Sequence, residues 1–194
     1  MKDKYYIYKV LRFILFPIFI LYFNPKIIGN NKIDKEGPLL LVGNHKHALD
    51  PILVDASSNR VIHALAKSEL FEGFFGFFFK SIGAIPVYLD APKNPEALKS
   101  GIEVLRNNGV INISPEAERN YTDKLLLPFK KGAVIMAKET NTKIIPYCIV
   151  GDYKFRSKNL KIVFGEAIHF KDETIEEANE ILFNTIKDLL LENK

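Results

Sequence analysis

The chain has 194 residues, 47% of them hydrophobic and 26% charged, so it can bury one folded core and is not a disordered chain. Its 27 Lys and Arg outnumber its 23 Asp and Glu, and this mild excess is spread along the sequence without a nucleic-acid-binding signature. We therefore expect no nucleic-acid partner. The one cysteine, Cys148, excludes an internal disulfide and a multi-cysteine zinc site, and its apolar surroundings predict a buried core residue.

Residues 5–23 are rich in aromatic and aliphatic side chains, but Lys9 and Arg12 interrupt them. The uncharged stretch, residues 13–23, contains Pro17 and is shorter than the ~20 apolar residues that a spanning helix needs. We therefore predict that residues 1–25 form an anchor lying in the membrane interface, on the cytoplasmic face. Its tyrosines would sit at headgroup level and its basic residues would meet anionic lipid: Tyr5, Tyr6, Tyr8 and Tyr22, with Lys2, Lys4, Lys9 and Arg12. A helix packed on the protein's own core and a tilted spanning helix are the alternatives.

Beyond the anchor, short apolar runs alternate with helical patterns. Strands are predicted at residues 39–42, 61–66, 84–89, 110–113, 144–150 and 161–164. Helices are predicted to begin at Asp50, as the N-cap, and to cover residues 69–81, 94–109, 131–140 and 174–192. This alternation predicts an α/β domain over residues 26–194, with a largely parallel sheet flanked by helices.

In a parallel sheet the active site lies beyond the carboxyl ends of the strands. The polar segments that leave those ends are residues 44–50, 67–69, 90–93 and 114–120. We therefore expect these four segments to share one edge of the sheet and to carry the chemistry.

The central motif places His45 at a strand end, five residues before Asp50. The turn between them can fold the carboxylate back onto Nδ1 of the imidazole, which fixes the tautomer and makes Nε2 a stronger base. Such a pair can remove a proton from a hydroxyl group. The alternative is that Asp50 only caps a helix and that His45 is only a loop residue.

Two further motifs follow along the chain. In residues 114–120, Glu116 can accept hydrogen bonds from a polyol, and Arg119 can grip a phosphate through its planar guanidinium. Residues 129–133 form a basic turn that opens a helix and could attract an anion. A charged surface loop and a solvated helix start are the simpler alternatives.

Taken together and in this order, the motifs resemble the lysophosphatidic acid acyltransferase family. The matching blocks are Asn44, His45 and Asp50; residues 66–70; residues 83–87; Pro115, Glu116 and Arg119; residues 129–132; and residues 144–146. The resemblance runs over about residues 27–165. It implies an enzyme of phospholipid biosynthesis that moves a fatty acyl group from acyl-CoA or acyl-carrier protein to the free hydroxyl of lysophosphatidic acid, giving phosphatidic acid at a membrane surface.

The resemblance implies that His45 and Asp50 are catalytic and that Lys67, Glu116 and Arg119 bind substrate. The chain departs from the family at Leu89, where the family commonly has an arginine that is thought to help hold the acceptor phosphate. His47 replaces the usual serine, and Ala117 and Glu118 replace a Gly-Thr pair. The acceptor-binding half is therefore altered, while the His/Asp half is intact.

The residues favour direct attack of the acceptor hydroxyl on the thioester, because the sequence has no Gly-x-Ser-x-Gly nucleophile elbow and no cysteine beside a base. No cofactor or metal cluster is expected. We expect backbone donors near the His45 turn to stabilise the oxyanion. Alternatives are another lysolipid or hydroxyl acceptor, a thioesterase, and a non-catalytic membrane-binding member of the fold. The phenylalanine-rich residues 70–79 would line an acyl channel, dip into the bilayer or pack in the core.

Overall fold

The computed structural model describes residues 5–88 and 94–194. Leu89 and the predicted edge segment 90–93 therefore lie outside the described residues, as do Lys2 and Lys4. The strands are β1 (Lys26–Ile28), β2 (Leu39–Gly43), β3 (Ile62–Lys67), β4 (Ile85–Val87), β5 (Val110–Ile113), β6 (Ile144–Val150) and β7 (Lys161–Phe164). The α-helices are α1 (Tyr6–Phe23), α2 (Asp50–Ala56), α3 (Gly73–Ser81), α4 (Pro95–Arg106), α5 (Gly132–Thr140) and α6 (Ile175–Asn193), and the short 3-10 helices are η1 (Asn30–Lys32) and η2 (Ser68–Phe71).

The strands form one sheet in the order β1-β7-β6-β2-β5-β3-β4. Every neighbouring pair is parallel except β6 and β7, which run antiparallel. The three central strands β6, β2 and β5 are buried along their whole length, as continuous apolar runs in a covered sheet should be. The predicted fold class, a largely parallel α/β sheet flanked by helices, is confirmed.

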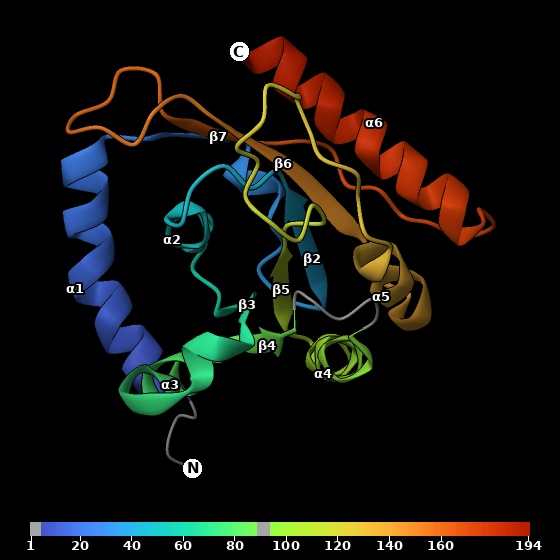
Figure 1. Ribbon diagram of the computed structural model, residues 1–194, viewed down its shortest axis with the longest axis horizontal. Coiled ribbons are helices and arrows are strands. Elements are labelled where there is room, and N and C mark those ends of the chain that lie inside the picture. The colour runs from blue at the N-terminus through green and yellow to red at the C-terminus, as the bar shows by residue number, and fades with distance from the viewer. Residues whose placement is uncertain (1–4, 89–93) are drawn as a thin grey trace.

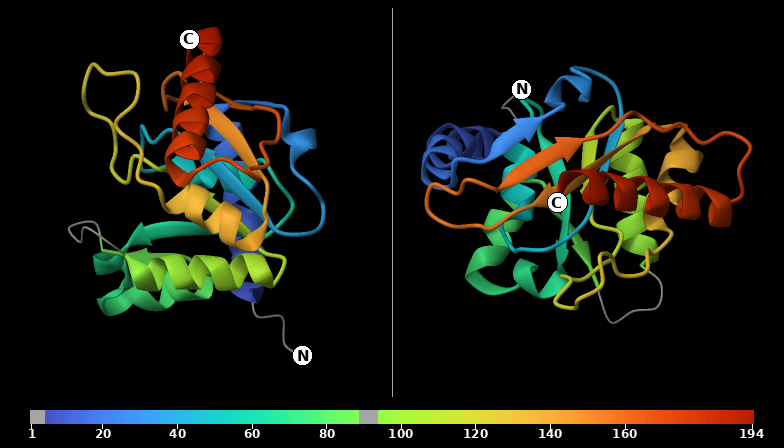
Figure 2. Two further views of the ribbon diagram at one scale, coloured as in Figure 1. Left: turned by 90° about the vertical axis from the view of Figure 1, so that its right-hand side faces the viewer. Right: turned by 90° about the horizontal axis from the view of Figure 1, so that it is seen from above.

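Alternate side chains of β2 divide the core into two layers. Leu40 and Val42 pack with buried residues of α4, α5 and α6, whereas Leu39 and Leu41 pack with Leu53 of α2 and with α1. Figure 1 shows α1 and α6 on opposite sides of the strands, and the view from above in Figure 2 agrees. Helices on both faces leave the carboxyl ends of β2, β5 and β6 as the place where polar loops gather.

Helix α1 packs on the domain along one side and exposes the other. Phe13 is 83% exposed, whereas Tyr8 is only 5% exposed. Arg12 donates hydrogen bonds to the carbonyl oxygens of Ser58 and Arg60, in the loop after α2. The prediction that Tyr8 and Arg12 face the headgroups was therefore wrong: both turn inward, because the helix uses them to dock on α2.

The exposed side of α1 is nevertheless apolar. Its exposed large hydrophobic side chains are Tyr6, Ile7, Val10, Phe13, Ile14, Leu15, Ile18, Leu21 and Tyr22. By length and composition, α1 is the one helix among the described residues that is long and apolar enough to cross a bilayer.

The phenylalanine-rich segment is not the single helix predicted over residues 69–81. The chain turns through η2, becomes extended at Glu72 and restarts as α3 at Gly73, whose φ of +58° is a left-handed conformation that favours glycine. Phe74 and Phe77 of α3 are 91% and 71% exposed. Plain core packing therefore does not describe these two side chains.

Other differences are small. Strand β1 was not predicted, because its three residues are exposed or half-buried and carry no apolar run. Of the strand predicted at residues 84–89, the described part forms a strand only at β4, which is three residues long. Helix α6 begins after Thr174, whose hydroxyl forms a capping box with Glu177.

Candidate active site

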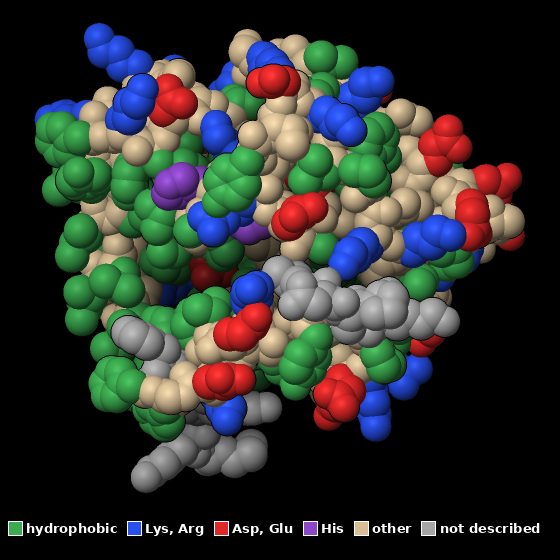
Figure 3. Space-filling model, in the orientation of Figure 1, with side chains coloured by type: hydrophobic (Ala, Val, Ile, Leu, Met, Phe, Trp, Pro, Cys, Tyr) green, Lys and Arg blue, Asp and Glu red, His purple; other side chains and the backbone are tan. Residues whose placement is uncertain are grey.

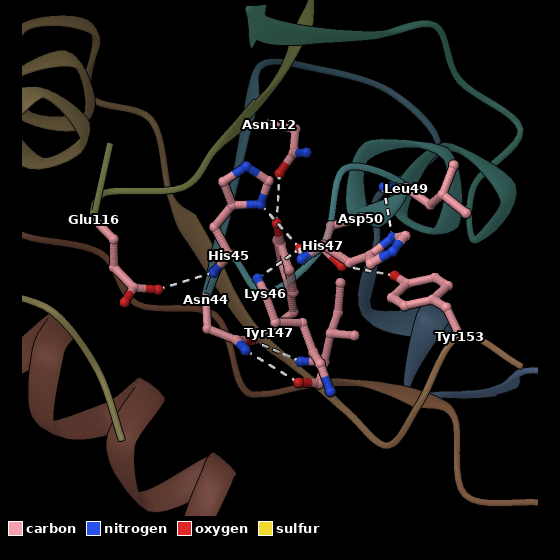
Figure 4. A network of polar contacts seen from close by, with 11 residues as sticks. Asn44, His45, Lys46, His47, Leu49, Asp50, Asn112, Glu116, Tyr147 and Tyr153 are labelled. Atoms are coloured by element: carbon pink, nitrogen blue, oxygen red, sulfur yellow. Dashed lines mark hydrogen bonds and ion pairs between the residues drawn. The ribbon is translucent and has the colours of Figure 1, made fainter. Parts of the chain in front are cut away.

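His45 and Asp50 meet at the carboxyl end of β2, in the middle of the sheet. Nδ1 of His45 lies 2.9 Å from Oδ2 of Asp50, and Figure 4 shows the two side chains facing each other. The Asp50 side chain is buried, whereas the His45 side chain is 23% exposed. With Nδ1 engaged by the carboxylate, Nε2 is the ring nitrogen that can accept a proton from a substrate.

The turn that joins the pair is held by the carboxylate of Asp50. Its Oδ2 atom also accepts hydrogen bonds from the backbone N–H groups of Lys46 and His47, both at 2.7 Å. Leu49, not Asp50, precedes the first residue of α2, so the prediction that Asp50 is the N-cap was wrong. The carboxylate instead closes the turn between His45 and Asp50, so the N–H groups of Lys46 and His47 are already engaged within the protein.

Tyr153 is a residue of this site that sequence reasoning missed. Its hydroxyl donates a 2.7 Å hydrogen bond to Oδ1 of Asp50, and its ring stacks on His47 at a centroid distance of 4.5 Å. Burial and the neighbouring Asp50 carboxylate raise the pKa of Tyr153, so its hydroxyl remains a donor. Only its position shortly after a strand end, three residues beyond Val150, could have pointed to it.

Glu116 braces the other flank of His45. It is only 4% exposed, and its two oxygens accept hydrogen bonds from the backbone N–H groups of His45 at 2.9 Å and Leu127 at 2.7 Å. Burial raises the pKa of Glu116, while these two backbone donors oppose the rise. The loop after β5 is therefore fixed to the loop after β2, and the N–H of Asn120 adds a 2.9 Å bond to the carbonyl oxygen of His45.

The predicted phosphate ligands sit at the same edge of the sheet but are less tightly held. Arg119 precedes Asn120, is exposed, and places its guanidinium 5.3 Å from the ring centre of Tyr121. Lys67 is the last residue of β3 and forms a 3.0 Å ion pair with Glu69. The structure thus joins His45, Asp50 and Glu116 by direct contacts, and it places Arg119 on the loop after β5 and Lys67 at the end of β3.

The basic turn at residues 129–133 has a structural role in this fold. The N–H of Lys130 donates to the carbonyl oxygen of Pro115 at 2.8 Å, and Lys131 pairs with Glu176. The ring of Phe129 packs against Phe183 of α6. The turn therefore ties α5 to the Glu116 loop.

Cys148 is confirmed as a buried residue, and burial raises the pKa of its thiol to about 11, so it is a poor nucleophile. Within residues 5–88 and 94–194, no group of three His, Cys, Asp or Glu side chains is placed to hold a metal ion.

Figure 3 shows histidine side chains reaching the surface among basic and hydrophobic ones, beside a hollow in the middle of the molecule.

Comparison with known proteins identifies the family of this chain. A family model described as acyltransferase matches residues 24–150. The 1-acyl-sn-glycerol-3-phosphate acyltransferase of Bacillus subtilis is 32% identical over 145 residues, which are 69% of this chain and 70% of that protein. Proteins of the same name from Helicobacter pylori and Saccharomyces cerevisiae are 35% and 32% identical, over 64% of this chain in each case. The chain spans only 54% and 42% of the lengths of these two relatives.

A solved structure shares the fold. The crystal structure of the 1-acyl-sn-glycerophosphate acyltransferase PlsC from Thermotoga maritima superposes with a TM-score of 0.71 at 21% identity, covering 99% of this chain and 83% of the other. The resemblance read from the motifs is therefore confirmed by independent matches to sequence and fold. Because the family model covers well over half of its residues, the chain belongs to the acyltransferase family.

Proposed function

We propose that this protein transfers a fatty acyl group from a thioester to the free hydroxyl of lysophosphatidic acid, giving phosphatidic acid. The observation that carries the proposal is the contact between His45 Nδ1 and Asp50 Oδ2 at a strand end. The relatives named above support lysophosphatidic acid as the acceptor, since that is the substrate their names give. A non-catalytic member of the fold would have no need of a buried carboxylate aimed at a half-exposed imidazole.

The chemistry needs one proton transfer and one acyl transfer. Asp50 keeps the proton of His45 on Nδ1, so Nε2 takes the proton of the acceptor hydroxyl as its oxygen attacks the thioester carbon. The C–S bond then breaks, and the imidazolium returns the proton to the departing thiolate. General base assistance of this kind is worth roughly 10²–10⁴-fold in rate.

Arg119 and Lys67 are our candidates for holding the acceptor phosphate. Both are cations at the edge where His45 emerges, and Arg119 offers a bidentate fork whereas Lys67 offers a point charge. Glu116 positions the His45 loop through its two hydrogen bonds from backbone N–H groups. Its remaining lone pairs can accept a hydrogen bond from the glycerol hydroxyl of the acceptor. Another lysolipid acceptor is the second candidate, because Leu89 stands where the family commonly has an arginine.

The membrane would be the source of the acceptor. We propose that α1 lies on a bilayer with its exposed apolar side in the lipid and the domain on the cytoplasmic face, so that residues 1–25 act as the anchor. Exposed Phe74 and Phe77 of α3 give the protein a second apolar site of contact with lipid.

Release of free thiol from an acyl thioester, measured with and without lysolipid acceptors, tests the proposal. Thiol release that depends on lysophosphatidic acid supports it. Equal release without any acceptor indicates a thioesterase, and dependence on a different lysolipid retains acyl transfer but replaces the acceptor.

A further inference from the structure

A cavity of about 480 Å³ lies beside His45, on the side of the sheet edge formed by β6 and β7. Its walls come from the loop after β2, the long loop after β5, the end of β6, the loop between β6 and β7, and the end of α6. Asn44, His45 and Lys46 form the wall nearest the dyad. A cavity of this size is in the range that binds small molecules and cofactors.

Six lysines from six different segments line this cavity: Lys26, Lys46, Lys124, Lys158, Lys161 and Lys194. Lys46 donates to the carbonyl oxygen of Gly151 and Lys161 to the side chain of Asn193, both of them neutral partners. Within the described part of the chain none of the six forms an ion pair, whereas Lys32, Lys67, Lys131 and Lys143 elsewhere each pair with a carboxylate.

The cavity contains little negative charge to offset these lysines. Glu116 is the one acidic side chain among its lining residues, and backbone N–H groups already bind both of its oxygens. The chain as a whole carries a net charge of only +4, so the gathering of six lysines here is a local feature. Like charges brought together in a concave site cost free energy unless an anion binds among them.

The separation of the lysines indicates what kind of anion fits. They approach the cavity from several sides, and lysine acts as a point charge rather than a bidentate fork, so the arrangement suits a ligand with several separate phosphate groups. Asn120, Thr122 and Asn159 add neutral groups that can hydrogen-bond to a sugar or a base. Neither Lys67 nor Arg119, the candidates for the acceptor phosphate, belongs to this wall.

We propose that this cavity binds the nucleotide half of coenzyme A, with its pyrophosphate and ribose phosphate among the six lysines and its pantetheine arm directed toward His45. The inference rests on the proposed function, because that function requires an acyl thioester to reach the imidazole. It names acyl-CoA as the donor and places the donor's phosphates apart from Lys67 and Arg119, the candidates for the acceptor phosphate.

The first test measures binding of free coenzyme A to the full chain in detergent by titration calorimetry. The cavity variant is Lys26→Gln, Lys124→Gln and Lys158→Gln together, and the control variant removes the same charge at exposed Lys99, Lys171 and Lys187, outside the cavity lining. We expect the cavity variant to weaken binding at least about tenfold, because charge-assisted hydrogen bonds are lost, and the control to bind as the wild type does. Coenzyme A lacking its 3′-phosphate should bind the wild type more weakly and lose less in the cavity variant.

The second test measures kinetics in mixed micelles with acyl-CoA. The cavity variant should raise KM for acyl-CoA by a similar factor and leave KM for the lysolipid unchanged. Equal binding of coenzyme A by the cavity and control variants would overturn the inference, as would a rise in the lysolipid KM alone. Wild-type protein that ignores coenzyme A but uses acyl-carrier protein would also overturn it.

These outcomes separate the inference from the proposed function. Lysine-dependent binding of coenzyme A without any acyl transfer supports the cavity assignment and contradicts the reaction. Acyl transfer without lysine-dependent binding of coenzyme A supports the reaction and contradicts the cavity assignment. If the triple variant loses its folded circular dichroism spectrum, the single variant Lys124→Gln, changed at an exposed loop residue, replaces it. Its binding of coenzyme A is then compared with that of the control variant.

Discussion

The hydroxyl of Tyr153 donates a 2.7 Å hydrogen bond to Oδ1 of Asp50, on the carboxylate oxygen that His45 does not use. The same ring packs edge-on against Phe23, at the end of α1, with a centroid distance of 5.6 Å. The backbone N–H groups of Arg156 and Ser157 donate to carbonyl oxygens of Tyr22 and Phe23. The dyad is therefore braced by the loop after β6, and that loop is in turn fixed to the proposed membrane helix.

Replacing Tyr153 with Phe should lower kcat and leave both KM values nearly unchanged, because the tyrosine orients Asp50 rather than touching substrate. Loss of a hydrogen bond to a charged group costs about 1.5–3 kcal/mol when the site cannot relax, so a fall of about ten- to a hundredfold is expected. The exposed Tyr6 provides a matched control, and Tyr6→Phe should keep the wild-type kcat. An unchanged kcat in Tyr153→Phe would show that the backbone amides of Lys46 and His47 suffice to hold Asp50.

Replacing Arg119 with Ala should raise the acceptor's KM strongly and the thioester's KM little. A charged hydrogen bond of this type is worth about 1.5–3 kcal/mol, which corresponds to about ten- to more than a hundredfold. Lys67→Ala should act in the same direction, and Leu89→Arg should improve use of a phosphate-bearing acceptor. Arg106→Ala, at an exposed position on α4, is the control. A wild-type enzyme that prefers a lysolipid without a free phosphomonoester, and ignores the Arg119 change, would remove phosphatidic acid as the product.

The membrane prediction is best tested on the exposed side of α1, because deleting the helix would remove the buried Phe19 and uncover the core residues packed around it. Phe13→Glu together with Leu21→Glu changes two of its most exposed apolar side chains. Co-sedimentation with anionic liposomes should fall strongly while the folded spectrum stays the same, since burial of apolar area drives binding of an interfacial helix. Leu191→Glu, at an exposed position on α6, is the control. Undiminished binding would move the lipid contact to Phe74 and Phe77.

Asp55 in α2 gives the folded state a dependence on pH. Its Oδ1 atom is buried without a hydrogen-bond partner, and burial raises the pKa of this carboxyl to about 8, although nearby Arg12 opposes the rise. Because the pKa of Asp55 is higher in the folded state than in the unfolded state, the neutral carboxyl favours the folded state. This contribution to the free energy of unfolding is fully present at acidic pH and is lost as pH rises toward about 8. Asp55→Asn should therefore raise Tm at pH 9 by a few degrees, at about 2–4 °C per kcal/mol for a chain of this size, and have little effect near pH 4. A Tm difference that is the same at both pH values would contradict this account.

Much of the fold could be predicted because buried parallel strands are continuous apolar runs, as at residues 39–42 and 144–150. The His45 and Asp50 contact could be predicted because both residues lie in one short turn. Tyr153 could not, since it approaches from a loop more than a hundred residues away and no local pattern marks a tyrosine as the partner of a carboxylate. The break between η2 and α3 was missed because phenylalanines stand on both sides of Glu72 and Gly73. The apolar pattern therefore gave no sign that one helix ends there and another begins. The lysine cavity was missed for the same reason as Tyr153: its residues come together only in the folded sheet.

The most direct test of the account is thiol release from acyl-CoA by His45→Ala, with lysophosphatidic acid present and with the folded spectrum verified. Turnover should fall by roughly 10²–10⁴-fold, because the imidazole takes the proton from the attacking hydroxyl. Asp50→Asn should also be severe, since an amide can stabilise the wrong tautomer of His45. Near wild-type turnover by folded His45→Ala would contradict the mechanism at its centre.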